Sequence, residues 1–190
     1  MAFGSLIDEP GAGLGAVTVR RVALETPFPV EFARSSATRD GAPTLTRVST
    51  GGASVPAVLL VLDEAVTVAA ARALLYQRET RSSEAIVPEG VDWIEELPGF
   101  RATSTCLYAA LAANIPPPLT GEKLAELALR SAASAAGYDR RDGISYLAQQ
   151  KRRGALTPLM PQYDRALLAR TGARDLDEAW QRARSAGIAP

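Results

Sequence analysis

Residues 55–62, Val-Pro-Ala-Val-Leu-Leu-Val-Leu, are the most apolar run of the chain, and Asp63 and Glu64 end it. Because residues 58–62 are all apolar, neither face of a strand formed by them would be polar, so we expect a central strand covered on both sides. The run has less than half of the roughly 20 residues that a membrane-spanning helix needs. The sequence therefore predicts a buried strand at the centre of the core.

The rest of the first half alternates β-rich segments with turn-rich clusters of Gly, Pro, Asp and Ser. Residues 66–78 differ, because they are rich in Ala, Leu and Arg and carry apolar side chains at helical spacing. This segment predicts a helix that ends near Glu79. Further strands are expected at residues 17–24, 30–33, 45–49, 91–94 and 104–112.

Three prolines at 116–118 precede a change of composition to Ala, Leu, Arg, Gln and Glu, which predicts four helices in the last third of the chain. Their expected starts are at Thr120, at Asp139 or Asp142, at Pro158 and at Asp175. We therefore expect an α+β protein in which residues 1–115 form a β-rich core and residues 119–190 form a helical extension that packs on it.

The composition excludes several classes of function. Lys and Arg number 21 against 21 Asp and Glu, so the chain has no net charge that would attract nucleic acid or an anionic membrane. Histidine is absent, which removes Ser-His-Asp and Cys-His nucleophile pairs and every metal site that contains His. Acid–base chemistry must therefore come from carboxylates, Tyr or Lys.

Cys106 is the only cysteine, so the chain can form neither an internal disulfide nor a thiolate metal cluster, as suits a reducing compartment. It lies in an apolar run, which favours a buried thiol in the core over a nucleophile. The N-terminal residues lack the basic and apolar regions of a secretory signal. We expect a cytoplasmic protein with no metal, no cofactor, and no nucleic-acid or membrane partner.

The first candidate site is the N-terminal segment Phe3-Gly4-Ser5-Leu6. A Gly-Ser turn after an apolar start can expose consecutive backbone N–H groups that hold a carboxylate or a polarised carbonyl oxygen. An ordinary turn at the end of a strand accounts for the same dipeptide. The segment therefore indicates a binding loop only in combination with other residues.

The second candidate is Glu79, at the end of the predicted helix. A carboxylate at a helix C-terminus meets an unfavourable dipole and, if partly buried, holds a proton more readily than a solvated one. The alternative is a solvated glutamate paired with a neighbouring arginine such as Arg78. Glu95 and Glu96 form a weaker candidate, because the side chains of adjacent residues usually diverge.

These features occur in a characteristic order. The chain presents Phe3-Gly4-Ser5-Leu6, then Gly51-Gly52 leading into the apolar run, then Leu74-Leu75-Tyr76-Gln77-Arg78-Glu79. Residues 1–112 thereby resemble the γ-glutamylcyclotransferase fold family, and particularly its ChaC-like branch. Members of that family have an N-terminal Tyr-Gly-Ser-Leu or similar motif, a Gly before an apolar strand, and a helix that delivers an Arg-Glu pair.

The resemblance implies a small, mixed, β-barrel-like core in which the loop of Phe3, Gly4, Ser5 and Leu6 holds a γ-glutamyl substrate. It also implies that Glu79 is the catalytic residue, a general acid and base. In that reaction the α-amine of the substrate attacks its own γ-carbonyl and releases 5-oxoproline. No enzyme nucleophile, metal or cofactor is needed, which suits a chain without His.

The chain also departs from the family pattern. Phe3 stands where the family has Tyr, and only two residues precede it, so we expect a short first strand. The motifs that separate glutathione-directed members from other branches are absent, which leaves the choice of γ-glutamyl substrate open. Two alternatives are a non-catalytic small-molecule-binding or interaction module on the same fold, and another acyl or amide transfer. The sequence does not specify the oligomeric state.

Overall fold

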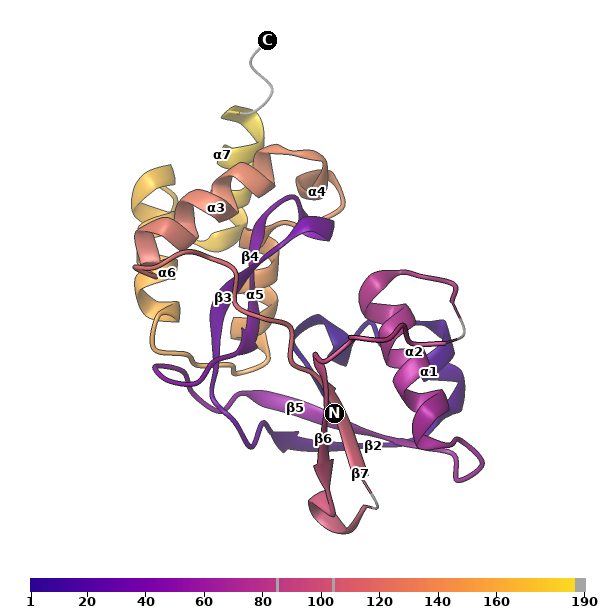
Figure 1. The fold of residues 1–190 in the computed structure, drawn as a ribbon. Coiled ribbons are helices and arrows are strands. Elements are labelled where there is room, and N and C mark those ends of the chain that lie inside the picture. Colours follow the sequence, from indigo (N-terminus) through magenta and orange to yellow (C-terminus); the bar gives the residue numbers. More distant parts are fainter. Residues whose placement is uncertain (85, 104, 187–190) are drawn as a thin grey trace. The chain divides into compact units, whose positions relative to one another are not determined.

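A computed structural model describes residues 1–84, 86–103 and 105–186 (Figure 1). The chain folds into two compact units, each assembled from separate parts of the sequence. The sheet unit contains Met1–Thr26 and Pro56–Leu111. The helical unit contains Pro27–Val55 and the residues from Ala112 onward.

The sheet unit is built around the apolar run that the sequence identifies. Strand β5 (Pro56–Leu62) lies between β1 (Ala2–Phe3) and β2 (Thr18–Glu25), and both neighbours are antiparallel to it. The predicted central place of the strand in the sheet is therefore confirmed. Its complete burial is not, because only Ala57 and Leu59 are buried and the other five residues are half-buried. The first strand has only two residues, as expected, and β2 is an edge strand with mostly exposed side chains.

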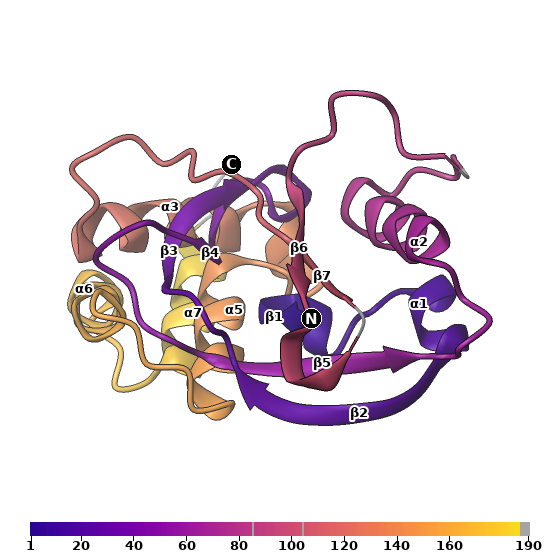
Figure 2. The ribbon, with the colours of Figure 1, turned by 60° about the horizontal axis from the view of Figure 1, so that its bottom comes forward.

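Two helices and a hairpin complete the sheet unit. Helix α2 (Val68–Thr80) begins where the Thr67 hydroxyl accepts a hydrogen bond from the Ala70 amide at 3.2 Å, and α1 (Ala12–Val17) lies beside it (Figure 2). Strands β6 (Ile94–Pro98) and β7 (Thr105–Ala109) form an antiparallel hairpin with the 3-10 turn η3 (Phe100–Ala102) at its tip. The buried core contains Ala2, Leu6, Leu14, Leu75 and Ile94.

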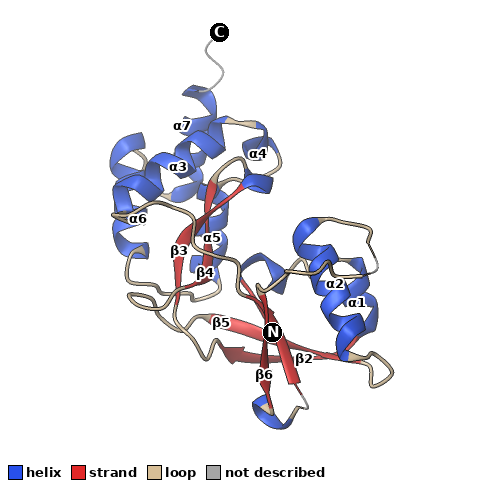
Figure 3. Cartoon of the chain, in the orientation of Figure 1, coloured by secondary structure: helices blue, strands red, loops and turns tan. Residues whose placement is uncertain are grey.

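The helical unit combines a hairpin with five helices (Figure 3). Its elements are β3 (Val30–Ser36), η2 (Ala37–Arg39), β4 (Ala42–Arg47), α3 (Gly121–Ala133), α4 (Ala135–Tyr138), α5 (Gly143–Arg152), α6 (Met160–Thr171) and α7 (Leu176–Ala186). The predicted caps Thr120 and Asp142 are confirmed, because their side chains accept backbone N–H groups of α3 and α5. No helix among the described residues combines the length and apolar character needed to cross a bilayer.

The expected barrel-like core does not form. In the part of the chain that the structure describes, the strands make three separate antiparallel sheets of three, two and two strands, and these do not close into a barrel. The reason is that β3 and β4 pair with each other, while the Phe32 ring meets Tyr146 and Tyr163 edge-on, at centroid distances of 6.1 and 5.4 Å. The observed fold is a mixed α+β architecture.

The two units also divide the chain differently from the expected parts, residues 1–115 and 119–190. Residues 27–55 group with the helices because buried polar groups bind them there. The Glu31 carboxylate, 2% exposed, accepts hydrogen bonds from the Thr157 hydroxyl at 2.5 Å and the Leu159 amide at 3.0 Å. At the other end of the hairpin, the Asp40 carboxylate accepts the Ala136 amide at 2.8 Å.

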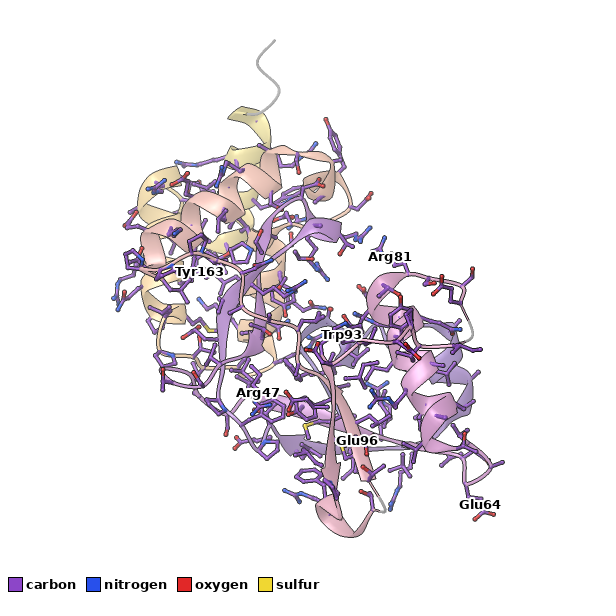
Figure 4. All side chains as sticks on the ribbon, in the orientation of Figure 1. Arg47, Glu64, Arg81, Trp93, Glu96 and Tyr163 are labelled. Carbon is purple, nitrogen blue, oxygen red and sulfur yellow. The ribbon has the colours of Figure 1, made fainter. Side chains whose placement is uncertain are left out.

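The burial of Tyr163 makes the stability of the helical unit depend on pH. Its side chain, which is labelled in Figure 4, is completely buried, and its hydroxyl donates to the Gly143 carbonyl oxygen at 3.1 Å. Burial, with a smaller contribution from Asp142, raises the pKa of Tyr163 well above its ordinary value of 10. The phenol therefore ionises in the unfolded chain before it can ionise in the folded one.

Above pH 10, the folded chain keeps the phenolic proton of Tyr163, whereas the unfolded chain loses it. The free energy of unfolding therefore falls as pH rises. We expect Tyr163→Phe to lower the free energy of unfolding by about 1 kcal/mol at neutral pH, because the hydrogen bond is lost. Above pH 10 the deficit should shrink, since phenylalanine cannot ionise. Urea unfolding at a series of pH values measures this. A deficit that stays constant up to pH 11 would contradict the argument.

Candidate active site

The N-terminal candidate segment forms a tight turn at the end of β1. Phe3 pairs with Ala57 of β5, and the next four residues form the 3-10 helix η1 (Gly4–Ile7). Gly4 is buried and has φ of +62°, a left-handed conformation that favours glycine. The turn thus depends on glycine at this position and fixes where Ser5 lies.

Arg78 connects this turn to the end of helix α2. Its Nη2 donates to the Ser5 hydroxyl oxygen at 3.1 Å, and its Nη1 donates to Glu79 Oε1 at 3.0 Å. A third bond runs from Nε to the Glu9 carbonyl oxygen at 2.9 Å. The two candidate segments lie more than 70 residues apart in the sequence, and both form hydrogen bonds with the Arg78 guanidinium.

The ion pair between Arg78 and Glu79 is largely shielded from water. The two side chains are 17% and 13% exposed, respectively. Glu79 therefore pairs with Arg78, as the alternative interpretation expects, but its side chain is largely buried and not solvated.

A cavity of about 760 Å³ lies in the same unit. Leu6, which follows Ser5, contributes to its lining. On α2 the lining residues are Val68, Ala71 and Leu75, and Leu75 lies one helical turn before Glu79. Ser5, Arg78 and Glu79 themselves do not line this cavity.

Glu95 and Glu96, the weaker candidate, are adjacent on β6 but bind different partners. The Tyr108 hydroxyl donates to the Glu95 carboxylate, whereas Glu96 forms an ion pair with Arg72 at 3.2 Å. The two carboxylates thus engage different partners, as expected for adjacent strand residues, which alternate between faces. Glu95 and Glu96 therefore do not form a paired-carboxylate site.

The described residues contain no group of three or more His, Cys, Asp or Glu side chains placed to hold a metal ion. Cys106 is 4% exposed, which confirms the prediction of a buried core thiol. The sequence did not indicate that Arg78 binds Ser5 and Glu9. An Arg-Glu dipeptide at a helix end carries no signal that identifies a partner so distant in sequence.

The need for glycine at position 4 can be tested by measuring the stability of a variant. We expect Gly4→Ala to reduce the free energy of unfolding by about 1–2 kcal/mol, because an alanine in a left-handed conformation brings its Cβ close to the next carbonyl oxygen. Gly15→Ala is the matched control, since no atom lies within 4 Å of the added Cβ. Urea unfolding followed by circular dichroism measures both. Equal stability of the two variants would show that the turn tolerates a side chain at Gly4.

Comparison of the chain with protein-family models, with curated proteins and with solved structures found no match in any of the three.

Proposed function

We propose that the protein is a γ-glutamylcyclotransferase-like enzyme that releases 5-oxoproline from a γ-glutamyl amide or peptide. The observation that carries the proposal is the contact of Arg78 with both Ser5 and Glu79. It supports a site in which the Gly-Ser turn and a shielded carboxylate act on one small molecule. The proposal includes a cytoplasmic location.

The proposed reaction is an intramolecular transfer of an acyl group. The α-amine nitrogen of the substrate forms a bond to the γ-carbonyl carbon, and the bond between that carbon and the amide nitrogen breaks. Glu79 accepts a proton from the substrate ammonium and returns one to the departing nitrogen. Because nucleophile and electrophile belong to the same molecule, the protein mainly bends the substrate and moves protons.

The remaining residues orient the substrate and Glu79. Backbone N–H groups around Gly4, Ser5 and Leu6 are proposed to bind the substrate carboxylate or to stabilise the developing oxyanion. Arg78 is a positioning residue, because it holds the Glu79 carboxylate and the Ser5 hydroxyl at fixed places. Phe3 pairs with β5 and supplies a ring without the hydroxyl of the family's Tyr.

A non-catalytic role on the same fold is the second candidate. It is favoured by the three hydrogen bonds from Arg78 to Ser5, Glu9 and Glu79, which would by themselves brace η1 against α2. In that case Glu79 is a structural partner of the guanidinium. The two candidates differ in whether removing the charge of Glu79 changes a reaction.

The test is incubation of the full chain with glutathione and a panel of γ-glutamyl amino acids and amines, followed by chromatographic measurement of 5-oxoproline. We expect release from at least one compound, at a rate proportional to protein concentration. Release that equals the rate without protein, for every compound in the panel, would leave only the binding role.

A further inference from the structure

Strand β2 forms one edge of its sheet. Within residues 1–84, 86–103 and 105–186, β2 pairs with β5 only, so the three-stranded sheet ends at β2 on that side (Figure 2). The backbone N–H and C=O groups that point away from β5 can therefore pair with a further strand. The pairing of β2 with β5 is irregular near Val19 and regular from Arg20 to Glu25. Residues 20–25 are thus the part of this edge that can continue the sheet.

The exposed side chains of this edge have a charge pattern that is complementary to itself. Arg21, Ala23 and Glu25 are exposed, and they lie on the same side of the strand because side chains alternate between sides. A cation and an anion therefore flank a small central residue. A second copy of the strand, running antiparallel, reverses this order and brings the Glu25 of each copy opposite the Arg21 of the other.

Arg21 can take part in such a pair without leaving its own chain. Its Nη2 donates to the Ile7 carbonyl oxygen. A guanidinium has further N–H groups, and these can donate to a carboxylate. Opposite charges in directly opposed positions stabilise an antiparallel pair of strands, whereas like charges destabilise it.

The charges also specify one register of the two copies. A two-fold axis at Arg21 would place two guanidinium groups opposite each other. An axis at Val22 or Leu24 would place the small Ala23 opposite a charged residue. An axis at Ala23 forms two pairs of Arg21 with Glu25. On the other side of the strand, the same register places the half-buried Val22 and Leu24 opposite each other.

We propose that the chain forms a symmetric dimer in which the β2 strands of two copies pair antiparallel, with the two-fold axis at Ala23. The two three-stranded sheets then become one continuous sheet. Since residues 21–25 of each copy supply the contact, the interface is small, and we expect a reversible dimer whose fraction rises with protein concentration. The proposal does not depend on the cyclotransferase reaction, because it uses neither Glu79 nor Ser5.

The first test is sedimentation equilibrium of the full chain over a range of concentrations. Arg21→Glu and Glu25→Arg should each weaken the dimer at least about tenfold, because an attractive pair becomes repulsive at two symmetry-related places. An equimolar mixture of these two variants should dimerise like the unaltered chain, since both pairs between the different variants are again of opposite charge. Arg152→Glu and Glu89→Arg make the same charge changes at other exposed positions and should leave the dimer unchanged.

The second test locates the two-fold axis. In the proposed register the two Ala23 Cα atoms lie about 4.5–5.5 Å apart, which is within the reach of a disulfide. Ala23→Cys should therefore form a disulfide-linked dimer under mild oxidation, as measured on a non-reducing gel. Val19→Cys, also exposed but away from the axis, should link much more slowly. The native Cys106 is buried and so adds little to either result.

Four results would each overturn the proposal. They are an unaltered chain that stays monomeric at every concentration, a dimer that survives both charge reversals, a mixture of folded variants that does not dimerise, and an Ala23→Cys chain that links no faster than Val19→Cys. Circular dichroism checks the fold of each variant. If Arg21→Glu does not fold, because its bond to Ile7 is lost, Glu25→Arg and the two cysteine variants decide.

Discussion

Glu79→Gln is expected to lower the rate of 5-oxoproline release at least about 100-fold, because a correctly placed general acid–base group contributes a factor of that order or more. The amide keeps the size of the carboxylate and an oxygen that can accept the Arg78 Nη1 bond, now 3.0 Å long. It cannot take a proton from the substrate ammonium. The loss should therefore appear in kcat, while circular dichroism and the thermal midpoint stay close to those of the unaltered chain.

The control is Glu84→Gln, an exposed glutamate shortly after the same helix. It removes the same charge from the surface and should leave the rate within about twofold of the unaltered chain, since surface substitutions have small effects. If Glu79→Gln and Glu84→Gln release 5-oxoproline equally fast, Glu79 is only the structural partner of Arg78. Its proposed role in proton transfer would then be lost.

Glu31→Ala is expected to destabilise the helical unit by about 3 kcal/mol or more, because it leaves several buried donors without an acceptor. These donors are the Thr157 hydroxyl and the amides of Phe32 and Leu159, at 2.5, 2.8 and 3.0 Å from the carboxylate oxygens. Urea unfolding followed by helical circular dichroism measures the loss.

Glu25→Ala provides the comparison, since Glu25 is an exposed residue on edge strand β2. Its effect should stay within about 0.5 kcal/mol. A loss below 1 kcal/mol for Glu31→Ala would show that other groups satisfy the donors, and that the hairpin is held mainly by its apolar contacts.

Local signals in the sequence predicted most of the elements. The apolar run predicted β5, and Thr120 and Asp142 predicted the starts of α3 and α5. Each signal acts within a few residues of the element it defines. Helix α1 was missed because it is short and contains two glycines, which are poor helix formers.

The grouping of elements was not predictable in the same way. Glu31 binds Thr157, 126 residues further along the chain, and Asp40 binds Ser134 and Ala136, 94 and 96 residues further along. The pattern of charged and apolar residues in a segment indicates that it forms a strand. It does not indicate which distant helix that strand contacts. The barrel-like core was expected from the family resemblance, and the observed pairing of β3 with β4 alone replaced it.

For the candidate site, the sequence predicted which segments matter and not how they connect. The order of the motifs singled out the turn of Gly4 and Ser5 and the carboxylate of Glu79. The structure joins them through the guanidinium of Arg78.

The alternation of the chain between its two units has a consequence for biosynthesis. Residues 27–55 leave the ribosome early, but the helices that cover Phe32 and Glu31 follow only after Pro56–Leu111 has been made. A nascent chain of this length exposes the Phe32 ring and the Glu31 carboxylate before their partners in the helices have been made. We therefore expect ribosome-bound intermediates ending near Leu111 to be good chaperone clients, and fragments that end there to be aggregation-prone.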